Sequence, residues 1–264
     1  MTNIGLTSDL VATLRDGGRM PLLGFGTWQL RGREAHDGVR WALDAGYRHI
    51  DTATGYANET EVGAALSESG VPREDVFVTT KMPPDHVGRE RRTLEESLSN
   101  LGTSYVDLWL IHWPPGGTAG VDSWRVFVQA HKEGLARAIG VSNYSLEQID
   151  ELIEATGEAP AANQIKWSPF LFDKTVYDGL ASRGVVLEGY SPFRAARLDD
   201  PVLAEIAGTH GKTPAQVIIR WHVQRGIVVI PKSARRERIE SNIDVLDFQL
   251  SPEEMGAVDG LSDA

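Results

Sequence analysis

Four residues that could together transfer a proton stand at regular intervals in the first half of the chain. Asp51, Lys81 and His112 each come at the end of a short apolar run, with separations of 30 and 31 residues, and Tyr56 follows Asp51 by five positions. A phenol titrates near pH ~10 and is a poor acid at neutral pH. A nearby ammonium group stabilises the phenolate and lowers the pKa of the phenol.

This combination of side chains favours acid catalysis. Lys81 could supply the positive charge to Tyr56, and Asp51 could keep the lysine protonated, although the two could also form a purely structural ion pair. The imidazole of His112 could orient or polarise a substrate oxygen. Together the groups could protonate an oxyanion as it forms, coupled to another agent such as a hydride from a cofactor. The sequence shows no metal-ligand spacing and no Ser-His-Asp order.

Composition excludes several other chemistries. The 264 residues include no cysteine, which excludes disulfides, thiolate zinc sites, iron–sulfur clusters and cysteine nucleophiles. With 37 acidic and 26 basic residues the formal net charge is −11, which argues against a nucleic-acid partner. The first ten residues lack a basic region followed by an apolar run, and no apolar stretch approaches the ~20 residues of a membrane helix. We expect a cytoplasmic protein that does not bind membranes.

Eight short apolar runs, each bounded by turn or polar residues, are typical of buried parallel strands. They are LLGFGT (22–27), YRHIDT (47–52), VFVTTK (76–81), VDLWLIH (106–112), ARAIGV (136–141), ANQIKW (162–167), VVLEGY (185–190) and GIVVIP (226–231). Amphipathic stretches separate them, and ~250 residues is the usual size of a (β/α)₈ TIM barrel. Barrel enzymes carry their active sites where the strands end, so the ends of the second, third and fourth runs should meet at one mouth.

Further elements complete the predicted barrel. Residues 10–20 read as a β-hairpin that closes the barrel floor, and the long segment 192–225 should hold two helices, at 200–208 and 214–225. Capping boxes should open helices at Ser145 with Gln148, at Thr213 with Gln216, and at Ser251 with Glu254, the last an extra helix near the C-terminus. Because no linker interrupts the pattern, we expect residues 1–264 to form a single domain.

Three segments resemble signatures of the aldo-keto reductase family. They are GYRHIDTATGYANETEVG (46–63), KEGLARAIGVSNY (132–144) and IPKSARRERIESN (230–242), and LIHWP (110–114) also matches the family's usage. The resemblance covers nearly the whole chain and is closest to the bacterial 2,5-diketo-D-gluconate reductase branch. It implies a monomer that reduces aldehydes and ketones with NADPH; we expect small dicarbonyls, aromatic aldehydes or sugar ketoacids as substrates.

The same resemblance assigns roles to individual residues. It makes Tyr56 the general acid, tuned by Asp51 and Lys81, with His112 aligning the carbonyl. For the cofactor it implies Ser142, Asn143 and Gln164 at the nicotinamide carboxamide, Tyr190 stacked on the ring, Lys232, Ser233 and Arg238 at the adenosine 2′-phosphate, and Asn242 at the adenine.

The residues themselves support a phosphate site. Lys232, Arg235, Arg236 and Arg238 form a basic cluster after the eighth run, where barrels often bind phosphate, and this favours NADPH over NADH. By position, Trp28 and Trp113 should form apolar walls of the substrate pocket. Six further histidines are interpreted as ordinary residues without a role in catalysis: His36, His49, His86, His131, His210 and His222.

Other functions remain open on the sequence alone. Lys81 could be the Schiff-base nucleophile of an aldolase or lyase, although that needs an uncharged lysine and Asp51 favours a charged one. The chain could also be a non-enzymatic subunit that senses the redox state of NADPH for a partner. A Rossmann fold is not indicated, because Gly24-Phe25-Gly26 is followed by Gln29 where a dinucleotide loop has glycine.

Overall fold

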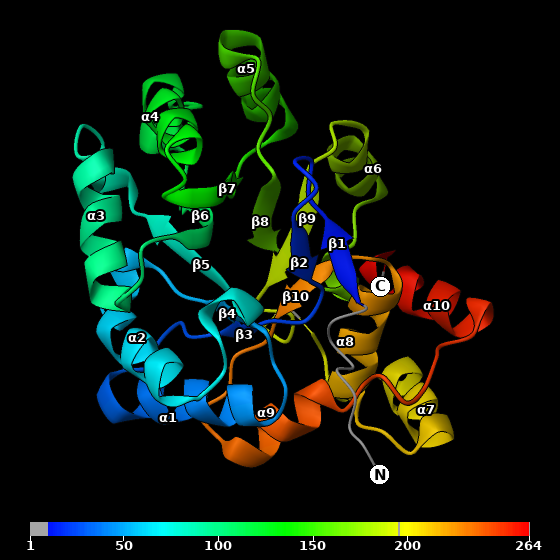
Figure 1. Cartoon of the computed structure of the whole chain (residues 1–264). Coiled ribbons are helices and arrows are strands. Elements are labelled where there is room, and N and C mark those ends of the chain that lie inside the picture. Colours follow the sequence, from blue (N-terminus) through cyan, green and yellow to red (C-terminus); the bar gives the residue numbers. More distant parts are fainter. Residues whose placement is uncertain (1–9, 195, 264) are drawn as a thin grey trace.

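The computed structural model describes residues 10–194 and 196–263, and it shows a parallel barrel surrounded by helices (Figure 1). Its eight-stranded sheet runs from β3 to β10, with each strand beside its neighbour in sequence. A parallel bridge between Leu23 and Val229 joins the two edges. The predicted (β/α)₈ barrel is therefore confirmed. The N-terminal stretch used to argue against a signal peptide lies, apart from its last residue, outside the described residues.

All eight expected strands are present, most of them with shorter bounds. They are β3 (Phe25–Gly26), β4 (His49–Asp51), β5 (Phe77–Met82), β6 (Val106–Ile111), β7 (Ala136–Ser142), β8 (Ala162–Lys166), β9 (Val186–Tyr190) and β10 (Val228–Ile230). Close neighbours explain the two glycines at the first strand, Gly24 just before it and Gly26 within it. A Cβ on Gly24 would lie 2.6 Å from Nδ1 of His49, and one on Gly26 would lie 2.9 Å from the Ile230 carbonyl oxygen.

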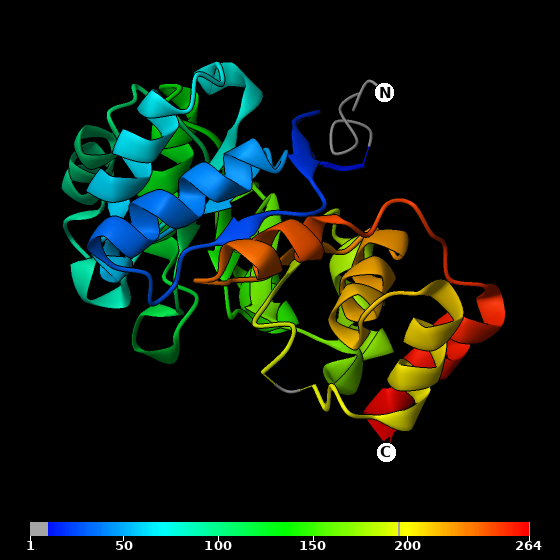
Figure 2. The ribbon, with the colours of Figure 1, turned by 90° about the horizontal axis from the view of Figure 1, so that it is seen from below.

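Ten helices are described around the barrel. They are α1 (Gly32–Asp44), α2 (Glu59–Glu68), α3 (Glu90–Leu101), α4 (Val121–Lys132), α5 (Leu146–Thr156), α6 (Lys174–Ser182), α7 (Pro201–His210), α8 (Pro214–Gln224), α9 (Arg236–Ile243) and α10 (Pro252–Asp259). The two helices predicted between the last strands are confirmed as α7 and α8. Helices α1 and α9 lie side by side, as do α7 and α10 (Figures 1 and 2), so the end of the chain packs beside earlier elements.

The three predicted capping boxes are confirmed at the starts of α5, α8 and α10. In each, the serine or threonine side chain accepts a hydrogen bond from the backbone N–H three residues on, and the side-chain oxygen of that later residue accepts one from the backbone N–H of the serine or threonine. These bonds satisfy backbone groups that a helix start leaves open, which explains why the helices begin at these residues.

The N-terminal hairpin covers the barrel floor. Strands β1 (Val11–Thr13) and β2 (Arg19–Pro21) pair antiparallel, and the turn between them contains Gly17, whose φ of 85° suits glycine. Hairpin residues Leu14 and Pro21 line a small cavity with Phe77 and Asp107, which lie at the amino-terminal ends of β5 and β6. The floor is thereby closed, and the opposite rim stays open.

Large aromatic residues fill the space between the barrel and its helices. Trp109 of β6 stacks on Phe127 of α4, with ring centroids 3.5 Å apart, and both are fully buried together with Trp124 and Trp221. Among the residues described, no helix is both long and apolar enough to cross a membrane.

The contact between α2 and α3 requires a glycine. A Cβ on Gly63 would lie 2.6 Å from the Leu101 carbonyl oxygen and 2.8 Å from that of Asn100. We expect Gly63→Ala to lower the free energy of unfolding by about 1–3 kcal/mol, because backbone must move to admit a methyl group. Gly256→Ala in α10 is the control: nothing lies within 4 Å of its Cβ position, and alanine should stabilise the helix by up to ~1 kcal/mol. Urea denaturation measures both; equal midpoints would contradict this packing.

Candidate active site

The four acid–base residues lie at the open rim of the barrel. Asp51 ends β4, Lys81 is the penultimate residue of β5, and His112 follows β6 directly. Tyr56 ends a short 3-10 helix, η1 (Thr54–Tyr56), in the loop after β4. Asp51, Tyr56 and His112 line one cavity of about 430 Å³, and Lys81 contacts Asp51. The strand ends thus bring together residues that are up to 61 positions apart in the sequence.

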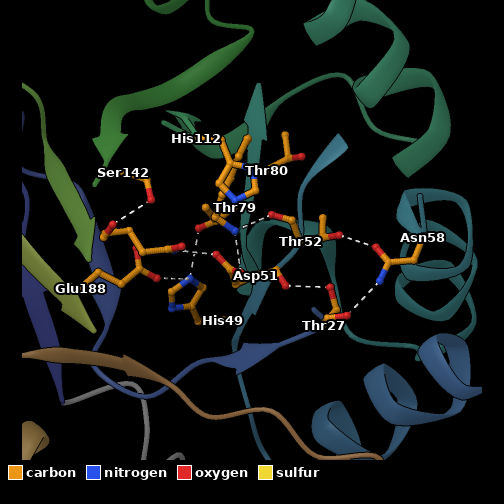
Figure 3. Close-up of polar contacts among 12 residues, drawn as sticks. Thr27, His49, Asp51, Thr52, Asn58, Thr79, Thr80, His112, Ser142 and Glu188 are labelled. Carbon is orange, nitrogen blue, oxygen red and sulfur yellow. Dashed lines mark hydrogen bonds and ion pairs between the residues drawn. The ribbon is translucent and has the colours of Figure 1, made fainter. Parts of the chain in front are cut away.

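A buried ion pair between Lys81 and Asp51 forms the base of this site, and Figure 3 shows Asp51 there. Lys81 Nζ donates to Asp51 Oδ1 at 2.7 Å and to the Thr52 carbonyl oxygen at 2.8 Å. The second carboxylate oxygen, Asp51 Oδ2, accepts from Gln164 Nε2 at 2.8 Å. Burial by itself would lower the pKa of Lys81, but the charge of Asp51 and its hydrogen bond to the ammonium hold that pKa above its ordinary value. Lys81 is therefore a permanent cation beneath the cavity.

The phenol of Tyr56 lies above this cation. Its ring centroid is 5.0 Å from Lys81 Nζ and 5.6 Å from the ring centroid of His112. Burial raises the pKa of Tyr56, and the attraction of Lys81 offsets only part of that increase. The expectation that Lys81 would bring the pKa of the phenol below its ordinary value is therefore wrong for the protein without substrate, because burial is the larger effect. The phenol keeps its proton, as a proton donor must.

His112 is a neutral imidazole. Burial, with a smaller contribution from the charge of Lys81, lowers the pKa of His112 to about 3. A neutral imidazole offers one N–H donor and one acceptor, so His112 can orient a carbonyl oxygen without competing with Tyr56 as the acid.

The side chain of Asn58 fixes the loop that carries Tyr56. Asn58 Nδ2 donates to the carbonyl oxygens of Thr27 at 3.0 Å and Leu30 at 3.1 Å, and Oδ1 accepts from Thr52 Oγ1 at 2.6 Å (Figure 3). Asn58 thereby ties the loop after β3 to the loop after β4. It lies inside the first signature segment, but nothing in its sequence spacing singled it out.

A second wall of the cavity comes from β7, β8 and β9. Ser142 Oγ donates to the Gln164 carbonyl oxygen at 2.7 Å, and the Tyr190 hydroxyl donates to Asn143 Oδ1 at 2.8 Å. Asn143 Nδ2 also reaches the His112 carbonyl oxygen at 3.2 Å. Asn143 has a φ of 64°, a left-handed conformation that asparagine tolerates better than most residues. All four of these wall residues line the cavity, and their contacts with a nicotinamide stay a prediction.

The basic cluster lies beyond this wall. Lys232 lines the cavity, whereas Ser233, Arg238 and Asn242 lie outside its lining, near or within α9. Arg236 pairs with Glu240 at 2.8 Å, but in the described part of the chain Lys232, Arg235 and Arg238 have no acidic partner within ion-pair distance. Unneutralised cations in an acidic protein suit an anionic group such as a phosphate.

The outer rim is aromatic. Trp28 and Trp113 line the cavity and remain 38% and 49% exposed, so they can contact a bound molecule. Sequence reasoning missed Arg194, which lines the cavity with its guanidinium carbon 5.0 Å from the centroid of the Trp28 ring. It stands in the loop after β9, where no motif drew attention to it.

Comparisons with known proteins agree with this fold and site. The model of the Aldo/keto reductase family matches residues 22–263. An aldo-keto reductase of Mycolicibacterium smegmatis is 46% identical over 253 residues, which cover 94% of this chain and 92% of that protein. A 9,11-endoperoxide prostaglandin H2 reductase of Trypanosoma cruzi is 43% identical over 258 residues, covering 95% and 91%.

A solved structure shows the same architecture. The aldo/keto reductase from Brucella melitensis superposes with a TM-score of 0.92 at 40% identity, covering 95% of this chain and 97% of that one. The chain belongs to the aldo-keto reductase family. It is accordingly an oxidoreductase that acts on carbonyl compounds with a nicotinamide cofactor.

The hydrogen bonds of Asn58 make a testable prediction. Asn58→Ala removes the acceptor of the Thr52 hydroxyl and one of two donors to each of the Thr27 and Leu30 carbonyl oxygens, so we expect the free energy of unfolding to fall by about 2–3 kcal/mol and kcat to fall at least ~10-fold. Asn100→Ala is the control, since exposed Asn100 makes one long contact, 3.5 Å to Glu59, and should change stability by less than ~0.5 kcal/mol. Thermal melts and steady-state rates measure both. Equal losses in the two variants would contradict the role of Asn58.

Proposed function

We propose that this protein is an NADPH-dependent reductase of small aldehydes and ketones, with Tyr56 as the general acid. The observation that carries the proposal is the buried Asp51–Lys81 pair beneath a protonated phenol, in a cavity that extends to Lys232. A cation under the phenol is useful only when a phenolate forms, which happens when the proton leaves.

The residues of the chain supply the proton side of the reaction. NADPH, when bound, supplies the hydride that is added to the carbonyl carbon. The Tyr56 hydroxyl donates its proton to the carbonyl oxygen, and neutral His112 holds that oxygen in place. Lys81 stabilises the phenolate that remains, and Asp51 keeps Lys81 protonated and oriented. The phenolate then regains a proton from solvent through the open mouth.

The donor set fits a phosphorylated dinucleotide. The Tyr190 ring, Ser142, Asn143 and Gln164 present an aromatic face and amide and hydroxyl groups beside Tyr56, as a nicotinamide and its carboxamide require. Lys232, Ser233 and Arg238 would hold the 2′-phosphate, and Asn242 the adenine. Because Lys232 and Arg238 lack acidic partners in the described chain, a phosphate there neutralises existing charge, and this supports NADPH over NADH.

The cavity rim suits small substrates. Trp28 and Trp113 offer apolar walls, which fit aromatic aldehydes, small dicarbonyls or sugar ketoacids. A place in the 2,5-diketo-D-gluconate reductase branch, a monomeric state, a cytoplasmic address and a single domain over residues 1–264 stay predictions. A Schiff-base reaction at Lys81 is disfavoured, because Asp51 holds the amine protonated and the side chain is fully buried.

Removing one hydroxyl tests the acid. Tyr56→Phe should lower kcat for carbonyl reduction by ~10²–10⁴, because proton donation to the oxygen is lost, while NADPH affinity stays within ~3-fold of wild type. NADPH consumption with an aldehyde panel measures the rate, and fluorescence titration measures binding. Tyr105→Phe, on the floor between Arg73 and Arg137, is the matched control and should keep wild-type rates. If Tyr56→Phe turns over like wild type, Tyr56 is not the acid.

Removing one cation tests the cofactor preference. Arg238→Ala should raise the Kd of NADPH by ~10–100-fold, since a charge-assisted contact to phosphate is worth about 1.5–3 kcal/mol, and should leave the Kd of NADH nearly unchanged. Arg236→Ala is the matched control, because that guanidinium already pairs with Glu240. Isothermal titration of each of the two variants with NADPH and with NADH gives four dissociation constants, which are compared with those of wild type. A similar loss of affinity for both cofactors in Arg238→Ala contradicts the 2′-phosphate assignment.

A further inference from the structure

A second carboxyl group lies inside the barrel, below the proton-transfer site. Glu188 (Figure 3) is in the middle of β9 and is fully buried. It stands in register with Gln164 of β8 and Val228 of β10. Gln164 is the residue that holds Asp51. Glu188 is thus on the strand next to Gln164 and faces the ion pair across the barrel interior, and the proposed reaction does not use it.

Neither oxygen of Glu188 has a hydrogen-bond partner within the described chain. The nearest basic group is His49, whose Nε2 lies 3.8 Å from Glu188 Oε1 and 3.1 Å from Thr79 Oγ1. His49 Nδ1 is also unpartnered among the described residues, and it faces the backbone of Gly24. A buried carboxylate without hydrogen bonds is costly, so this geometry favours the neutral carboxylic acid.

The surroundings of Glu188, taken together, also favour the neutral carboxylic acid. The titratable groups turned toward it inside the barrel are His49 and Asp51 from β4 and Lys81 from β5, while β8 and β10 present uncharged Gln164 and Val228. Asp51 and Lys81 already balance each other, so an ionised Glu188 would be a net buried charge. Burial first, and then the charge of Asp51, raise the pKa of Glu188 to about 8, and the opposing effects of the Gln164 side chain and of the charge of Lys81 are smaller. Burial lowers the pKa of His49 to about 3, so the imidazole does not take the proton.

We propose that Glu188 is a positioning residue that, when it loses its proton in alkaline solution, places a negative charge below Lys81 and makes Tyr56 hold its own proton more tightly. This inference rests on the proposed role of Tyr56 as the acid. A nearby negative charge disfavours the phenolate. As the pH rises, Glu188 therefore ionises first and the phenol stays protonated. The site continues to reduce carbonyls, and oxidation of alcohols, which needs the phenolate as base, is held back.

The pH profile of the isosteric variant tests this inference. Glu188→Gln cannot ionise, so the apparent pKa of the alkaline limb should fall by about one unit for both reduction and alcohol oxidation. Glu188→Asp keeps a titratable group and should restore the limb toward that of wild type. The matched control is Glu59→Gln, since Glu59 is also buried but accepts from Thr80 Oγ1 at 2.6 Å and does not line the cavity that holds Tyr56. If the alkaline limbs of the pH–rate profiles are the same in Glu188→Gln as in wild type, the proposal is overturned.

A second measurement needs no variant and no turnover. Infrared titration of the wild-type protein should show the carbonyl band of a buried carboxylic acid at neutral pH, which disappears above about pH 8. Where Glu188→Gln folds, its spectrum should lack that band. Absence of the band from wild type at neutral pH overturns the inference whatever the activity data show. An active Tyr56→Phe variant, by contrast, removes the proposed acid and leaves the infrared result intact, so the two failures are distinguishable.

Discussion

The site depends on the pairing of one buried cation with one buried anion. Lys81 is fully buried and Asp51 nearly so, and removing either charge would leave the other without compensation in a medium that solvates it poorly. The pair is held by further hydrogen bonds, from Lys81 to the Thr52 carbonyl oxygen and from Gln164 to Asp51. These bonds involve β4, the loop after it, β5 and β8, so the position of the charge is fixed by the barrel itself. The positive charge that the reaction needs is therefore held in a fixed position.

Burial disfavours the charged form of each titratable group around that pair. The groups in contact with it decide whether it is nevertheless charged. Burial would deprotonate Lys81, but Asp51 prevents this. It keeps His112 and His49 uncharged, since neither has a close anion that compensates. It keeps Tyr56 protonated until the reaction itself demands a phenolate. The cation beneath the phenol thus acts on the state in which the proton has left, and that is where catalysis requires stabilisation.

The sequence was sufficient for the architecture because a barrel repeats one simple pattern. The apolar runs predicted all eight strands. Because Asp51, Lys81 and His112 stand at the ends of three of these runs, the sequence also predicted that they would meet at one rim of the barrel. It was insufficient wherever a side chain acts through contacts across the barrel. Glu188 reads as one polar residue in an apolar run, and His49 as an ordinary histidine. Asn58 and Arg194 gain their roles from loops that meet only after folding. The direction of the Tyr56 pKa also depends on burial depth, which no spacing encodes.

The buried acid at Glu188 also has a cost in stability. Because folding raises the pKa of Glu188 to about 8, the folded chain binds that proton more tightly than the unfolded chain, whose glutamate titrates near ~4.3. The linked contribution to stability is fully present at acid pH and declines between these two values, by about 1.4 kcal/mol for each pH unit well inside that interval. At neutral pH an uncharged residue of similar shape would avoid this loss. Breaches of simple burial rules are expected at functional sites. A destabilising carboxyl beside Gln164, which itself contacts Asp51, is therefore better explained by proton transfer than by packing.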